Sequence, residues 1–137
     1  MGNRKKKVLA VDNDPEFLIA IERFLEEEGF DTTTTWNTCE VPVLVAARHF
    51  DLVLIGNHPP EINPADILRR LNSTGAQVPC IVLDSVAQHP FEAQALSSLG
   101  AYAVVCKGQS KQLAGVIREC VHASRGDLSK HNAAAAN

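Results

Sequence analysis

The sequence lacks a long hydrophobic run, a secretion signal and a strong excess of charge. No apolar stretch approaches the ~18 residues that a membrane-spanning helix needs. The basic segment 4–7 is followed by only a short apolar run before Asp12, less than the ~7–15 apolar residues of a secretory signal. Lysine and arginine number 13 against 16 acidic residues, a formal charge of −3. We therefore expect a cytoplasmic domain that binds neither nucleic acid nor a membrane surface.

Closely spaced cysteine pairs are also missing. The four cysteines lie far apart in the sequence, at Cys39, Cys80, Cys106 and Cys120, and no C-x-x-C pair occurs. This spacing argues against a zinc site or a redox motif. We expect small buried thiols and no cofactor.

The chain has the size and composition of one globular domain. It has 137 residues, of which 45% are hydrophobic and 21% charged, and both values are typical of a folded domain. Residues 125–137 are different, because they carry no apolar face. We interpret residues 1–124 as the domain and residues 125–137 as a tail, or as a linker to an output domain of a longer protein.

Short apolar runs alternate with longer amphipathic stretches along the chain. Runs rich in Val, Leu, Ile or Thr predict strands at 8–11, 30–36, 51–55, 79–83 and 101–106. Apolar residues at helical spacing predict helices at 15–28, 41–50, 62–71, 91–99 and 109–123. Before the first helix, an acid followed by Pro15 suits an N-cap, and Gly29 suits the helix end.

Five such strand–helix units predict the fold class. Strands of nearly continuous Val, Leu and Ile are typical of a parallel sheet that is covered on both faces. Right-handed crossovers then give a doubly wound α/β sandwich of three layers. The working site of such a sheet lies at the carboxyl ends of its strands. The loops to inspect are therefore 12–14, 56–60, 84–85 and 107–108.

At these loops the chain resembles the receiver domain of bacterial two-component response regulators, over about residues 5–123. The resemblance rests on an ordered set of segments: 8–15 (VLAVDNDP), 51–55 (DLVLI), Pro60, 78–83 (VPCIVL), and Gly100-Ala101 followed by Lys107. It implies a flavodoxin-like (βα)5 fold with strand order 2-1-3-4-5. It also implies transfer of a phosphoryl group to an aspartate at the end of the third strand.

The resemblance assigns further roles at the carboxyl ends of the strands. In the family, a pair of acids after the first strand helps to hold Mg²⁺, an ion that prefers oxygen ligands and neutralises phosphoryl charge. A hydroxyl residue ends the fourth strand and a lysine ends the fifth. Carried over, these positions and their neighbours form a vestigial phosphorylation pocket of Asp12, Asn13, Gly56, Asn57, Asp84, Ser85 and Lys107.

Most of the pocket departs from the family pattern. The acceptor position falls on Gly56, which has no side chain, and the neighbouring Asn57 offers only an amide. The aromatic switch position of the fifth strand falls on Val104. Asp12 and Lys107 alone keep the family's residue types. We therefore expect a degenerate receiver with no catalytic residue.

Asp84 and the remaining acids allow several interpretations. One hypothesis pairs Asp84 with Lys107, and its alternative has Asp84 capping the next helix or facing water. Asp12 and Asp14 are weak candidates for a metal site. In the alternative interpretation, Lys107 holds Asp12 and Asp14 caps the first helix. A single loop histidine, His58, is expected to be exposed and to have no metal-binding or acid–base role.

The expected function is a phosphorylation-independent signalling module that is not an enzyme. Receivers bind protein partners, often a second copy, through the fourth helix, fifth strand and fifth helix. The corresponding candidates here are Phe91, Leu96, Tyr102, Val104, Gln109 and Arg118. Such domains commonly precede DNA-binding output domains.

Other readings remain open. One is a small-ligand-sensing flavodoxin-like domain, and another is a receiver with residual phosphate or Mg²⁺ binding. A third is a conventional receiver with a different acceptor, for which Asp51 would be the nearest acid, although it lies ~16 Å from the strand end at the rise of a β-strand.

Overall fold

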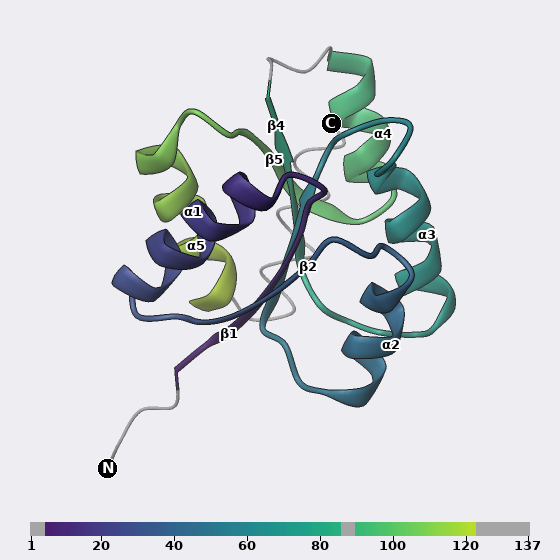
Figure 1. The fold of residues 1–137 in the computed structure, drawn as a ribbon. Coiled ribbons are helices and arrows are strands. Elements are labelled where there is room, and N and C mark those ends of the chain that lie inside the picture. Colours follow the sequence, from purple (N-terminus) through teal and green to yellow (C-terminus); the bar gives the residue numbers. More distant parts are fainter. Residues whose placement is uncertain (1–4, 86–89, 123–137) are drawn as a thin grey trace.

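In the described part of the chain, five parallel strands form one sheet in the order β2-β1-β3-β4-β5, and five helices cover it (Figure 1). The computed structural model describes residues 5–85 and 90–122. The strands are β1 (Lys7–Val11), β2 (Asp31–Thr35), β3 (Leu52–Gly56), β4 (Cys80–Asp84) and β5 (Ala101–Cys106). The helices are α1 (Pro15–Glu27), α2 (Glu40–Ala47), α3 (Pro64–Ser73), α4 (Pro90–Ser98) and α5 (Ser110–His122).

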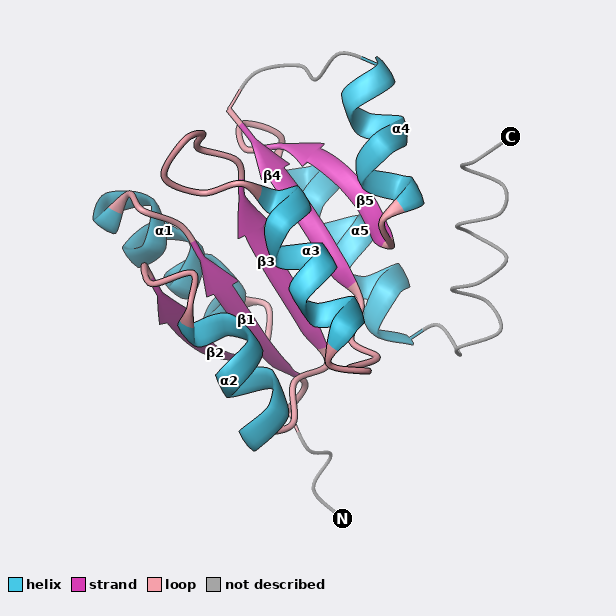
Figure 2. Ribbon diagram, turned by 90° about the vertical axis from the view of Figure 1, so that its right-hand side faces the viewer, coloured by secondary structure: helices cyan, strands magenta, loops and turns pink. Residues whose placement is uncertain are grey.

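The flavodoxin-like fold and its strand order are confirmed. Helices α2, α3 and α4 lie on one face of the sheet, and α1 and α5 lie on the other (Figure 2). No helix of the described residues is both long and apolar enough to cross a membrane. The predicted domain boundary at 124 and the tail 125–137 fall outside the described residues.

Alternation along the strands divides the core into two clusters. On β3, Leu52 and Leu54 pack toward α1 and α5, whereas Val53 and Ile55 pack toward α2, α3 and α4. Successive side chains of a strand point to opposite faces of the sheet. The face to which a residue at a strand end points therefore follows from alternation along that strand. By this count Gly56 belongs to the α1 and α5 face. This parity decides which polar residues meet above the sheet.

Local capping fixes where the helices begin and end. Asp14 caps α1 by accepting a hydrogen bond from the Glu16 N–H at 3.1 Å, as the sequence predicts. Past the other end of α1, Gly29 has a φ of 93°, a conformation that glycine adopts without strain.

The third helix begins at Pro64, two residues later than the predicted helix 62–71. Asn63 caps it by accepting from the Ala65 N–H at 3.0 Å. Ile62 instead exchanges backbone hydrogen bonds with His58. The loop between β3 and α3 is therefore closed on itself, which fixes the position of His58.

The cysteines give a direct test of the core. Burial raises the pKa of both the Cys80 and Cys120 thiols to about 12, so at pH 8 only about one thiol in 10⁴ is ionised at each. Cys39 is exposed and Cys106 is half-buried.

With a thiol-specific reagent at pH 8, we expect fast labelling of Cys39 and slower labelling of Cys106. Cys80 and Cys120 should react only after denaturation, and peptide mapping identifies the site. Early labelling of Cys80 would contradict this core.

Candidate functional site

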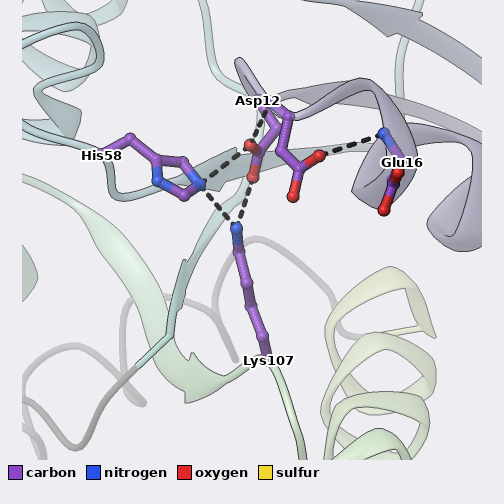
Figure 3. Close-up of polar contacts among 5 residues, drawn as sticks. Asp12, Glu16, His58 and Lys107 are labelled. Carbon is purple, nitrogen blue, oxygen red and sulfur yellow. Dashed lines mark hydrogen bonds and ion pairs between the residues drawn. The ribbon is translucent and has the colours of Figure 1, made fainter.

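Three charged or polar side chains meet above the carboxyl ends of β1, β3 and β5 (Figure 3). Lys107 Nζ lies 2.7 Å from Asp12 Oδ2, and His58 Nε2 lies 2.9 Å from Asp12 Oδ1. His58 Nε2 also lies 2.7 Å from Lys107 Nζ. We call Asp12, His58 and Lys107 the strand-end cluster. It joins residues 95 positions apart in the sequence.

Asp12 is the centre of the cluster and is completely buried. In addition to its two side-chain contacts, its Oδ1 accepts a hydrogen bond from the backbone N–H of Asp14 at 2.9 Å. A buried carboxylate is stable only when it is paired and hydrogen-bonded. Both oxygens of Asp12 are therefore held by partners within the protein.

Gly56 makes room for this carboxylate. A Cβ atom built on Gly56 would lie 2.1 Å from Asp12 Oδ2 and 2.7 Å from Asp12 Cγ. Both distances are far below any real contact of a Cβ atom, so no residue with a side chain fits at position 56 while Asp12 keeps its place. The carboxylate of Asp12 thus occupies the space in which the side chain of residue 56 would begin.

Lys107 is enclosed by partners of different kinds. Its ammonium group lies 4.1 Å from the centre of the Phe17 ring, on α1, in addition to its contact with Asp12. An ammonium ion over an aromatic face gains a cation–π interaction. With 13% of its side chain exposed, the lysine points inward to the cluster and away from solvent.

His58 is the member of the cluster that the sequence did not predict to lie there. Its side chain is only 27% exposed and its Nε2 faces both Asp12 and Lys107. A carboxylate only accepts hydrogen bonds and an ammonium group only donates them. With a proton on Nε2 the imidazole donates to Asp12, and without one it accepts from Lys107. Its position two residues beyond Gly56 is the signal by which the sequence places it at the strand ends.

The predicted pairing of Asp84 with Lys107 is wrong. Asp84 is buried, but Lys107 contacts it only through the backbone, where Lys107 N–H donates to Asp84 O at 2.7 Å. The Asp84 carboxylate instead accepts from Asn57 Nδ2 at 3.4 Å. Strand parity explains the difference. Asp84 follows the face of Val82, toward α2, α3 and α4, whereas Lys107 follows the face of Val105, toward α1 and α5.

The other predicted pocket residues add no side-chain contact to the cluster in the described part of the chain. Asn13 and Ser85 are exposed, and Asp14 is engaged as the cap of α1. The donor set does not fit Mg²⁺, because position 56 offers no carboxylate and both Asp12 oxygens are in use. Among residues 5–85 and 90–122, no three His, Cys, Asp or Glu side chains are grouped to hold a metal ion.

The predicted interaction face is only partly at the surface. Leu96 and Tyr102 are 7% and 4% exposed and pack in the core, so they are corrected to core residues. Val104 is half-buried against the α2–α4 side of the sheet. Gln109 is exposed, and so is Arg118, which pairs with Glu28. The side chain of Phe91 is outside the described residues.

Comparison with known proteins identifies the family and the fold. The family model of the response regulator receiver domain matches residues 8–118. No curated protein matches the sequence significantly. The solved structure of a CheY-like receiver domain from Methanospirillum hungatei has 22% identity and a TM-score of 0.76, with coverage of 93% of this chain and 98% of that chain.

Two further solved structures share the fold. The orphan response regulator HP1043 of H. pylori is 19% identical, with a TM-score of 0.73 and coverage of 85% of this chain and 97% of that chain. The BeF3-activated receiver domain of Klebsiella pneumoniae RstA is 21% identical, with a TM-score of 0.78 and coverage of 86% and 100%. At these identities the likeness is one of fold.

The clash at position 56 generates the first test of the cluster. We expect Gly56→Ala to lower the free energy of unfolding by about 1–3 kcal/mol, because the new methyl group meets a carboxylate that cannot move freely. In an Asp12→Ala background the same change should cost almost nothing. Urea unfolding of the four proteins gives the coupling energy. Gly108→Ala is the matched control, because its Cβ meets nothing within 4 Å. An equal cost in both backgrounds would show that Asp12 does not fill this space.

The ion pair itself generates the second test. Lys107→Met leaves the buried Asp12 carboxylate without its cation, and we expect a loss of about 3 kcal/mol at pH 7, toward the lower end of the range for buried pairs. The double variant Asp12→Asn with Lys107→Met should recover part of this loss, since no unpaired charge remains. Arg69→Met breaks the exposed pair with Asp66 and should cost less than about 1 kcal/mol. Equal losses for Lys107→Met and Arg69→Met in urea unfolding would mean that the buried pair contributes no more than a surface pair.

Proposed function

Because the chain belongs to the response regulator receiver family, we propose that it is a receiver that works without phosphorylation. In this proposal it is a protein-interaction module of a two-component regulator and not an enzyme. Membership of the family supports a role in signalling. The strand-end cluster supports the absence of phosphorylation.

The position of the Asp12 carboxylate against the Gly56 backbone carries the proposal. A phosphoryl acceptor must present a carboxylate to an incoming donor at the end of β3. Here position 56 has no side chain, and the nearest carboxylate is fully buried. A buried, paired carboxylate is a poor nucleophile because solvent-borne donors do not reach it.

The commitment of Lys107 supports the same conclusion. In a phosphorylated receiver this lysine would contact a phosphoryl oxygen. In this chain its ammonium already has a carboxylate at 2.7 Å and an aromatic ring at 4.1 Å. The internal carboxylate thus takes the place of an added anion, and the domain holds one arrangement of its strand ends without any modification.

Signalling would then pass through a protein surface. We place this surface on α4, β5 and α5. Arg118 of α5 is exposed there, as is Gln109 just before α5. The partner is a second copy of the chain or another protein. The domain itself takes no part in binding nucleic acid or membrane, in keeping with its charge of −3. Its four free cysteines fit the reducing cytoplasm.

The proposal is tested by offering the protein a phosphoryl donor. We expect no phosphoryl adduct in the intact mass after incubation with acetyl phosphate and Mg²⁺. Beryllofluoride should likewise leave the amide NMR signals of Gly56, Asp84 and Lys107 in place, and sedimentation should show the same oligomeric state with and without donor. The physical reason is that Asp12 and Lys107 already neutralise each other in the site.

Two controls make this result interpretable. A receiver that keeps its acceptor aspartate, treated in parallel, shows that the donor is active. Gly56→Asp in this chain restores an acid but meets the Asp12 carboxylate, so we expect no efficient phosphorylation of this variant either. An adduct on the unmodified chain, mapped to any residue of the strand-end cluster, would overturn the proposal.

A further inference from the structure

A groove between α3 and α4 lies apart from the strand-end cluster. Both helices cover the same face of the sheet (Figure 2). The groove has a volume of about 350 Å³ and apolar walls formed by Pro64, Ala65, Ala95, Leu96 and Leu99. Pockets for small molecules usually measure roughly 300–1,000 Å³ and have mostly apolar walls with a few polar groups. The groove therefore has the size and the lining of a site for a compact ligand.

Asn57 contributes a hydrogen-bond acceptor to the groove. It is one of the lining residues, and its Nδ2 donates to Asp84 Oδ2 at 3.4 Å. A carboxylate cannot donate, so this contact requires the nitrogen of the amide to face Asp84 and the oxygen to face away. No donor within residues 5–85 and 90–122 reaches Asn57 Oδ1. The atom of this side chain that is left for a ligand is therefore its oxygen.

Asn63 lines the same groove, and the opposite end of its amide is free. Its Oδ1 accepts a hydrogen bond from the Ala65 N–H at 3.0 Å and thereby caps α3. The oxygen is thus held at the start of the helix, and the nitrogen points away from it. In the described part of the chain, no acceptor takes a hydrogen bond from Asn63 Nδ2. The two asparagines consequently offer a ligand one acceptor and one donor.

The charged side chains of the lining are already engaged. Arg69 pairs with Asp66 at 3.2 Å, and Glu92 is engaged as well. A charged ligand would have to compete for a group that is in use, whereas a neutral ligand would not. The neutral polar side chains of the lining are those of Asn57 and Asn63. The groove is therefore best matched by an uncharged ligand that carries both a donor and an acceptor.

We propose that the groove binds a small neutral amide with a compact apolar body. The amide N–H donates to Asn57 Oδ1, the amide oxygen accepts from Asn63 Nδ2, and the apolar body packs against Ala65, Ala95 and Leu99. The site makes the domain a receptor for such an amide. This proposal does not rest on the domain being insensitive to phosphoryl donors, because no residue of the strand-end cluster lines the groove.

Three probes of nearly the same shape test the proposal. Benzamide carries a donor and an acceptor, acetophenone has a methyl group in place of the NH2 group, and α-methylstyrene also lacks the oxygen. Each probe is titrated into the full chain, and binding is followed by amide NMR. We expect saturable shifts for benzamide at Asn57, Asn63, Ala65 and Ala95. Acetophenone should bind about threefold more weakly and α-methylstyrene about tenfold more weakly, since each lacks one more hydrogen bond.

The order of the three affinities decides between a specific site and an apolar surface. A groove that is merely apolar would bind α-methylstyrene most tightly, because this probe gives up the least hydration on burial. That reversed order, equal binding of the three probes, or no binding at all would overturn the proposal.

Asn63→Asp removes the donor without removing the helix cap. The aspartate keeps an oxygen for the Ala65 N–H, so the start of α3 is preserved, but it has no N–H of its own. We expect benzamide and acetophenone to bind about fivefold more weakly, because both accept through a carbonyl oxygen. Asn37→Asp is the matched control and should change nothing. Asn37 Oδ1 accepts from the Cys39 N–H at 3.0 Å in the same way, but Asn37 does not line the groove.

A second variant blocks the groove itself. Ala95→Phe fills it from an exposed position of α4 and should abolish the benzamide shifts. Thermal melts confirm that each variant is folded. Equal benzamide affinities of Asn63→Asp and Asn37→Asp would overturn the assignment of the donor, and unchanged binding by Ala95→Phe would overturn the assignment of the groove.

Discussion

The arrangement of the strand ends depends on one buried ion pair, between Asp12 on the β1 side of the sheet and Lys107 after β5. Two strands, β3 and β4, separate β1 from β5 in the sheet. The lysine reaches the carboxylate across both strands, and the carboxylate holds its place because Gly56, at the end of β3, has no side chain to displace it. The strand-end cluster and Gly56 therefore form one structural unit, in which a change at one residue affects the others.

Much of the fold could be predicted from the sequence because its signals are local and repeated. Apolar runs recur in all five strand–helix units, and glycines follow α1, α3 and α4. The edge position of β2 agrees with its run of threonines. The start of α3 was placed two residues early, because Ile62 continues the apolar spacing of the helix. It belongs instead to the loop, where its backbone pairs with His58. A backbone bridge within a loop leaves no mark on the spacing of apolar residues.

The site was predicted less well, and for a definite reason. Its members were identified by their positions at strand ends, but which of them meet depends on the face to which each side chain points. Asp84 ends β4 and Lys107 follows β5, but their side chains belong to opposite faces of the sheet. The register shift between β4 and β5 breaks the simple alternation, so the face of Lys107 could not be counted from the sequence. His58 was dismissed because a single loop histidine carries no spacing pattern. Its approach to Asp12 follows from the closed loop, which only the three-dimensional structure shows.

The contact between Asp12 and the Gly56 backbone also bears on how such a domain changes over generations. With a glycine at position 56 and the Asp12 carboxylate against its backbone, the two positions are not independent. A mutation that introduces a side chain at residue 56 places it in space that the Asp12 carboxylate already fills. Such a mutation therefore lowers stability at once, whatever it does to activity. Residue 56 can accept a side chain only after Asp12 has changed, and that change removes the carboxylate that pairs with Lys107. The geometry therefore makes a glycine at position 56 easy to keep and hard to replace.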